Sequence, residues 1–223
     1  ILQSTVRINE LTQLANELEM PAVCITDYNN LMGSFHFLKS LENINKKNKS
    51  ENKKTLKPII GITLNVCEDH LDRSRRDDGY QIVFIAKNKK GYKNLSKLSS
   101  LAYTKGFYYV PRVDKNLVLN FKEDLIVLTG NTYGEVSSKL LNIGEKQAEE
   151  SLLWWNKHFK DDLYIEIMRH NLEDENRINP VLIKFSVKHK IKLVATNSVF
   201  YLTKEQANSH DILSVSYTHL RAH

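Results

Sequence analysis

Asp27 is the first residue whose type and position could support chemistry. It follows the apolar run AVCI at residues 22–25 almost directly and lies in a polar segment that ends at Gly33. In α/β barrels, side chains just past the strand ends form the functional face, where a carboxylate could take part in catalysis or metal binding. A short acidic side chain here could equally cap the following helix or close an Asx-turn. Both interpretations of Asp27 remain open at this point.

The cysteines and histidines do not have the spacing of a metal site. Cys24 and Cys67, the only cysteines, lie far apart inside apolar runs, and the sequence has no CxxC. We interpret both as buried free thiols in reducing surroundings. Four histidines have no ligand-like spacing and are interpreted as ordinary helix residues: His36, His158, His189 and His210.

Aromatic and basic residues are interleaved at Tyr108, Tyr109 and Arg112. Such a pattern can bind nucleic acid, because rings stack on bases while basic groups contact the backbone. A strand with one buried aromatic face explains the same residues equally well. The residues are therefore compatible with either role.

The composition is that of a folded globular protein. The 223 residues are 41% hydrophobic and 26% charged, which fits one large domain. The formal net charge of +6 is compatible with work near nucleic acid. Six lysines between residues 46 and 57 follow no apolar period and predict a solvated loop. Neither a membrane-length apolar run nor an export signal is found, so a cytoplasmic protein without a membrane partner is expected.

The elements that must position Asp27 alternate between helix and strand. Predicted helices cover residues 6–19, 31–44, 90–102, 135–141, 145–159 and 180–189, and predicted strands cover 22–25, 59–66, 82–85, 125–128, 163–167 and 192–195. This alternation predicts parallel βαβ units, because a parallel connection needs a long crossover. It favours an α/β barrel. An open doubly wound sheet is the alternative, but no Gly-rich phosphate loop supports it.

Five segments, in this order, carry a family resemblance. They are PAVCITDYNNLMG at 21–33, KPIIGITLNV at 57–66, IAKNKKGYKNLSKLSS at 85–100, GFYYVPRVDK at 106–115 and LVATNSVFYL at 193–202. Together they resemble the PHP domain at the amino terminus of bacterial DNA polymerase III alpha subunits. The NxxGYxNL element at 88–95 and the YxPR element at 109–112 distinguish this group from free-standing PHP phosphatases.

The resemblance implies a distorted seven-stranded (β/α) barrel of the PHP type over residues 1–214. We expect the barrel to be incomplete at the N-terminus, because the opening HxH motif and first strand would lie before Ile1. Residues 215–223 break the pattern, so we interpret them as a foreign or artefactual tail and do not read His219 and His223 as metal ligands.

Intact PHP domains, by the same resemblance, hold a cluster of metal ions for phosphoester hydrolysis. Of the ligand positions visible here, only Asp27 and His170 keep a family ligand. The substituted positions hold poor ligands: Tyr28, Thr63, Gln81, Asn131, Ser198 and Phe200. Because each ion of such a cluster needs about three protein ligands, we expect no catalytic residue and no bound metal at this site. Asp27 would instead be a buried carboxylate, with Thr63, Gln81, Asn131 and Ser198 as its hydrogen-bond donors.

The function implied by the resemblance is that of a structural and docking module inside a replicative DNA polymerase. Nucleotidyl transfer, with its Mg²⁺, would take place in other domains. The implied partners are those domains, a proofreading exonuclease subunit, and DNA through the full-length protein. The alternative is a metal-dependent phosphoesterase or 3′–5′ exonuclease, and a weaker one is a free-standing PHP phosphatase.

Overall fold

The computed structural model describes residues 4–221 and divides into two compact units. The larger unit contains Cys24–Met32 and Ile59–Thr196. The smaller unit contains Ile1–Val23, Gly33–Pro58 and Asn197–His223.

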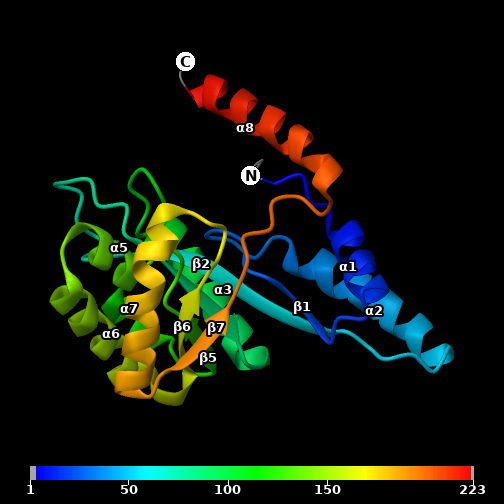
Figure 1. Ribbon diagram of the computed structural model, residues 1–223, viewed down its shortest axis with the longest axis horizontal. Helices are drawn as coiled ribbons and strands as arrows, with labels where there is room; N and C mark the ends of the chain where they lie inside the picture. The colour runs from blue at the N-terminus through cyan, green and yellow to red at the C-terminus, as the bar shows by residue number, and fades with distance from the viewer. Residues whose placement is uncertain (1–3, 222–223) are drawn as a thin grey trace. The chain divides into compact units, whose positions relative to one another are not determined.

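The chain forms a curled, mixed sheet of seven strands, most of whose residues belong to the larger unit (Figure 1). The sheet order is β1-β2-β3-β5-β6-β7, and β4 pairs with β2. The strands are β1 (Ala22–Ile25), β2 (Lys57–Cys67), β3 (Tyr80–Ala86), β4 (Arg112–Asp114), β5 (Leu125–Leu128), β6 (Leu163–Ile167) and β7 (Lys192–Ala195). The expected α/β class with a seven-stranded, barrel-like sheet is confirmed.

Strand β3 corrects the expectation of parallel units throughout. It pairs antiparallel with both β2 and β5, whereas β2 with β4, β5 with β6 and β6 with β7 pair in parallel. The segment between β2 and β3, residues 68–79, contains no helix. Without a crossover helix the chain returns beside β2, which places the two strands antiparallel.

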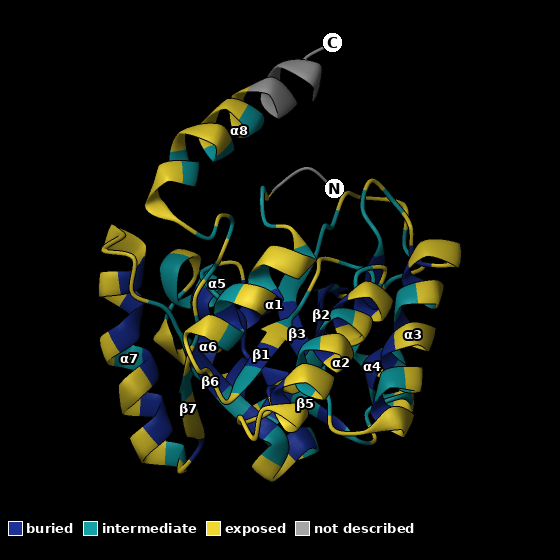
Figure 2. Ribbon diagram, turned by 90° about the vertical axis from the view of Figure 1, so that its right-hand side faces the viewer, coloured by how far each residue is buried: buried dark blue, intermediate teal, exposed yellow. Residues whose placement is uncertain are grey.

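Helices pack against this sheet and enclose the core. They are α3 (Lys89–Thr104), α4 (Lys115–Asn120), α5 (Glu135–Asn142), α6 (Glu145–Phe159) and α7 (Glu173–His189). Ile62, Phe84, Leu98 and Trp155 are at most 1% exposed, and they join β2 and β3 to α3 and α6. The rings of Phe84 and Trp155 meet edge to face with centroids 6.2 Å apart. Figure 2 shows buried and exposed stretches alternating along α7, as expected of a helix with one face on a core.

The smaller unit contains α1 (Ile8–Glu17), α2 (Ser34–Ser50) and α8 (Ala207–Arg221). Thr12 Oγ1 lies 2.7 Å from Ser40 Oγ, which links α1 to α2. The lysine-rich segment was expected to be a loop, but α2 continues through its first part to Ser50. Lysines in a last helical turn interact favourably with the helix dipole, which explains this correction. None of the helices among the described residues is long and apolar enough to cross a membrane.

The NxxGYxNL element fixes the start of α3. Asn88 Oδ1 accepts hydrogen bonds from two backbone N–H groups of the first turn, at 2.8 and 3.1 Å, and so caps the helix. A Cβ on Gly91 would lie 2.2 Å from Asp124 O, so this approach requires glycine. Asn94 Nδ2 donates to Glu123 O at 2.9 Å. The element therefore fastens α3 to the turn before β5.

The YxPR element fixes the loop between β2 and β3. Arg112 is 1% exposed. Its guanidinium donates to the carbonyl oxygens of Gly106, Asp72 and Asp77 at 3.1, 2.8 and 3.0 Å. The nucleic-acid interpretation is therefore wrong for Arg112, because its charge is already bound to backbone inside the protein.

Candidate functional site

Asp27 lies immediately beyond β1, and its backbone extends the pairing with β2. Thr63 N donates to Asp27 O at 3.0 Å, and Tyr28 forms an isolated bridge with Thr63. The Asp27 side chain is exposed, although the surrounding protein raises the pKa of its carboxyl by desolvation. The structure thus brings Asp27, Tyr28 and Thr63 together at one strand end.

The alternative roles of Asp27 as a helix cap or turn former are wrong. Gly33 occupies the cap position of α2, and the turn before it is formed by Asn30, whose Oδ1 accepts from Met32 N at 3.0 Å. The expectation that Thr63 donates to Asp27 is also wrong. Its hydroxyl donates to Thr26 O at 3.1 Å, because the backbone bridge turns it toward the β1 chain.

Glu166 is the buried carboxylate of this region, which the sequence analysis missed. It lies on β6 and is 4% exposed. Thr196 Oγ1 donates to its Oε1 at 2.5 Å, while its Oε2 is buried without a hydrogen-bond partner among the described residues. Burial raises the pKa of the carboxyl, against opposing hydrogen bonds from Thr196 and Gly130. The sequence does contain a signal for Glu166, because it is a charged residue inside the apolar run of a predicted strand.

Tyr28 and Gln81 border the same polar interior. Burial, and then the nearby Glu166 and Tyr133, raise the pKa of the Tyr28 phenol, which keeps it protonated. Gln81 N donates to Tyr133 O at 3.0 Å, and Gln81 Oε1 is buried without a partner in residues 4–221.

Asn131 lies in the loop after β5. Its Oδ1 accepts from Tyr133 N at 2.9 Å and closes a turn within that loop. The preceding Gly130 has φ +84°, and a Cβ there would lie 2.2 Å from Gln81 O. The Asn131 loop and Gln81 are therefore neighbours, as their family positions imply.

His170 is held by the carboxylate of Glu175. Its Nδ1 lies 2.6 Å from Glu175 Oε1, and its backbone N–H donates to Glu175 Oε2 at 2.5 Å. Burial alone would raise the pKa of Glu175, but the bonds from His170 lower it. His170 is thus tied to the first turn of α7.

Ser198 and Phe200 belong to the smaller unit. Phe200 O accepts from Thr5 N at 2.9 Å, and the Phe200 ring stacks on His210 with centroids 5.4 Å apart. His210, expected to be an ordinary helix residue, thus packs in α8.

The donors at the strand ends do not fit a cluster of divalent cations. Such ions need anionic oxygens or neutral imidazoles. Tyr28 stays protonated, Thr63 and Asn131 already bond to backbone, and burial disfavours the ionised form of Glu166. We therefore derive no metal-dependent step at this site.

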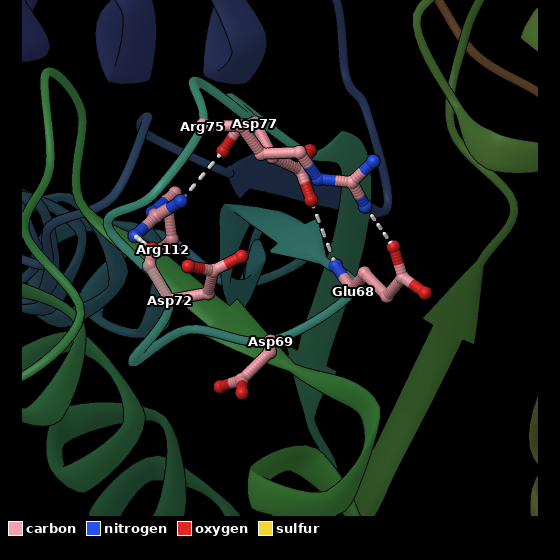
Figure 3. A pocket seen from close by; sticks show the side chains of 6 residues that line it. All are labelled: Glu68, Asp69, Asp72, Arg75, Asp77 and Arg112. Carbon is pink, nitrogen blue, oxygen red and sulfur yellow. Dashed lines mark hydrogen bonds and ion pairs between the residues drawn. The ribbon is translucent and has the colours of Figure 1, made fainter.

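A second polar cluster lies beside the loop that Arg112 holds. Figure 3 shows one of its members, Asp69, in the pocket lined by Glu68, Asp72, Arg75, Asp77 and Arg112. Ligand atoms of Asp69, His70 and Asp114 all lie within 4.8 Å of one another. His70 Nδ1 is 2.5 Å from Asp114 Oδ2, and Asp114 Oδ1 accepts from Leu117 N at 2.7 Å. Burial would raise the pKa of Asp114, but these hydrogen bonds hold it below its ordinary value. The three residues could hold one divalent cation.

The two cysteine thiols differ in their exposure. Cys67 is buried, as expected, and burial raises its pKa to about 12. Cys24 is exposed, so the expectation is wrong there. It lies on β1, the strand at one end of the sheet order.

The sequence model of the PHP domain family matches residues 1–170. The chain belongs to the PHP domain family. This PHP chain is similar to DNA polymerase III subunits alpha from several bacteria. The identity is 36% to the Aquifex aeolicus subunit, 34% to the Campylobacter jejuni subunit and 32% to the Borreliella burgdorferi subunit, over 95–96% of this chain.

The chain spans 18% of the length of these relatives. A similar fold is found in a solved structure from Bifidobacterium adolescentis, provisionally described as a metal-dependent phosphoesterase. The TM-score is 0.55 at 11% identity, over 89% of this chain and 84% of the other. At this identity the likeness supports the fold alone.

Proposed function

We propose that this chain is the PHP domain of a DNA polymerase III alpha subunit and acts as a structural and docking module without catalysis of its own. The similarity over 95–96% of the chain to alpha subunits supports the assignment. Residues 1–214 would form the domain and residues 215–223 a foreign tail. DNA synthesis, with Mg²⁺, would belong to other domains of a cytoplasmic polymerase.

One observation carries the non-catalytic part of the proposal: the strand-end donors are neutral or already bonded. Thr63 and Asn131 contact backbone, and Tyr28 keeps its proton. Asp27 is the one exposed carboxylate among these family positions. A rigid polar end of this kind suits a platform for the other polymerase domains and for a proofreading exonuclease.

Calorimetric titration with Zn²⁺ and Mn²⁺ tests the absence of a metal cluster. Because Asp69, His70 and Asp114 could take one ion, the titration is run on the wild type and on Asp69→Asn. We expect at most one ion in the wild type and loss of that ion in the variant. Two or more tightly bound ions that persist in Asp69→Asn would refute the proposal.

The alternative is a metal-dependent phosphoesterase or 3′–5′ exonuclease. Retention of Asp27 and His170, together with the description of the Bifidobacterium neighbour, favours it. Hydrolysis of a phosphodiester such as bis(p-nitrophenyl) phosphate with Mn²⁺ distinguishes the two. We expect no hydrolysis above the rate with metal alone. Hydrolysis that is lost in His170→Ala but kept in Asp69→Asn would establish the alternative.

A further inference from the structure

Helix α3 lies in the most one-sided charged stretch of the larger unit. Between Gly79 and Val113 the sequence has no Asp or Glu, although the chain carries 26 of them in total. The same stretch has seven basic residues: Lys87, Lys89, Lys90, Lys93, Lys97, Lys105 and Arg112. Except for the buried Arg112, all of these are exposed.

Three of the lysines form a row on the outer face of α3. Lys89, Lys93 and Lys97 are spaced four residues apart, so they lie above one another on one side of the helix. Leu95, Leu98 and Ala102 on the opposite side are fully buried. Exposed stretches of α3 face outward in Figure 2.

This lysine row works against the stability of the helix. Like charges four residues apart repel each other, and cations at a helix N-terminus oppose the helix dipole. The first turn of α3 contains no acidic residue. Lys87 and Lys90 pair with Asp162 and Glu123. Within the described chain, no ion pair joins the three lysines of the row to a carboxylate, so their charge is available to an anion.

Exposed aromatic rings lie at and just beyond the carboxyl end of α3. Tyr103 and Phe107 are 46% and 49% exposed. Their rings are stacked, with centroids 6.5 Å apart and an interplanar angle of 20°. Nearby in sequence, Tyr109 is 62% exposed and has a left-handed backbone, φ 62°, which is unfavourable for an aromatic residue. Arg76 lies 4.9 Å from its ring centroid.

We infer that the outer face of α3, from Lys89 to Phe107, together with Tyr109, binds single-stranded nucleic acid. The lysine row complements the phosphates, and the rings at its end offer flat surfaces on which bases stack. A protein that recognises a duplex places an element in a groove and contacts the base edges there, so it does not need exposed, stacked aromatic rings. A helix of 16 residues is about 24 Å long, which suits a short single-strand site of roughly four nucleotides. This inference is independent of the proposed function.

Fluorescence anisotropy with a labelled oligothymidylate of about 16 nucleotides tests the inference across a range of salt concentrations. The wild type should bind with strong salt dependence. Replacing Lys89, Lys93 and Lys97 together by Gln should reduce the slope of log K against log salt by about 2, at about 0.7 for each phosphate contact. Phe107→Ala and Tyr109→Ala should each weaken binding by about five-fold or more.

The smaller unit supplies matched controls. Lys47, Lys49 and Lys54 are also exposed lysines without an ion pair among the described residues, and Phe35 is 68% exposed. Replacing these lysines by Gln, or Phe35 by Ala, should leave affinity and slope within two-fold of the wild type. If the two triple lysine variants weakened binding equally, general charge attraction would explain the binding, and the inference would be overturned. Loss with the α3 lysines but not with the rings would show phosphate attraction without base stacking, which also overturns it.

Photo-crosslinking gives a second readout that does not depend on a variant folding. An oligothymidylate carrying 5-iodouracil is irradiated with the wild-type chain, and adducts are mapped by mass spectrometry. Adducts on Tyr103, Phe107 or Tyr109 are expected. Adducts confined to other aromatic residues, or no adducts under conditions in which anisotropy shows binding, would refute the site.

Discussion

Glu135 is the residue whose replacement tests the packing of the larger unit most directly. It lies in the first turn of α5, is 4% exposed, and both its oxygens accept hydrogen bonds, from residues on three helices. Lys115 and Lys139 donate to its Oε1 at 2.8 Å each, and Trp155 Nε1 donates to its Oε2 at 2.8 Å. Glu135→Gln keeps the shape and removes the charge.

The size of the effect follows from these contacts. Breaking a buried ion pair on one side costs about 3–5 kcal/mol. The side chains of Lys115 and Lys139 are 30% and 22% exposed, so both can partly rehydrate. We therefore expect Glu135→Gln to destabilise the protein by about 3 kcal/mol, near the lower end of that range. With an m-value of about 2 kcal/mol per molar urea, the midpoint should fall by about 1.5 M.

Urea unfolding followed by tryptophan fluorescence measures this shift. Glu145→Gln is the matched control, because Glu145 pairs with Lys184 at 2.6 Å on the surface, with side chains 48% and 62% exposed. Its replacement should change stability by less than about 1 kcal/mol. If Glu135→Gln and Glu145→Gln gave equal free energies of unfolding, the reasoning about the buried network would be refuted.

The same network predicts a pH dependence. Burial would raise the pKa of Glu135, but Lys115 and Lys139 hold it below its ordinary value. A lowered folded-state pKa contributes stability above the unfolded pKa, and this contribution disappears as pH falls through the folded value. The difference between wild type and Glu135→Gln should therefore be constant near neutral pH and shrink below about pH 4.5.

The other predictions concern single contacts and are also measured by urea unfolding. Gly91→Ala should cost about 1–3 kcal/mol, because the new Cβ would meet Asp124 O at 2.2 Å; wild-type stability would contradict this approach. Arg112→Lys should destabilise the protein by about 2 kcal/mol and speed hydrogen exchange in residues 68–79. The reason is that one ammonium cannot reach all the carbonyls that the guanidinium binds. Unchanged exchange would contradict the role of Arg112 in holding this loop. Glu166→Gln should stabilise the protein near pH 7 and have little effect near pH 4: with its folded-state pKa raised, the carboxyl contributes stability below the unfolded pKa and loses it as pH rises. A variant less stable than wild type at pH 7 but not at pH 4 would contradict this sign.

The periodic elements could be predicted because each has a strong local pattern. The strands at residues 125–128 and 163–167 occur at those residues as β5 and β6. Strand β4 was missed because three residues carry no periodicity, and its pairing with β2 depends on contacts distant in sequence. The antiparallel direction of β3 was missed because alternation of elements does not encode strand direction when one connection lacks a helix.

The candidate site was less predictable, because it depends on which way side chains turn. Asp27 and Thr63 do meet at a strand end, as barrel geometry requires. The sequence could not show that the Thr63 hydroxyl bonds to Thr26 O or that Glu175 binds His170. Those partners are fixed by backbone pairing and by the first turn of α7. The carboxylate buried in this region proved to be Glu166, on β6.

The NxxGYxNL and YxPR elements have structural roles in this fold. Asn88 and Gly91 set α3 against the turn before β5, and Arg112 fastens the loop between β2 and β3. Both act on the flanks of α3, the helix that presents the lysine row. A helix fixed at both ends by buried contacts can carry repelling lysines on its outer face without fraying, because packing rather than surface charge determines its stability. Asn88, Gly91 and Arg112 are thus the residues that allow α3 to display an otherwise unfavourable surface.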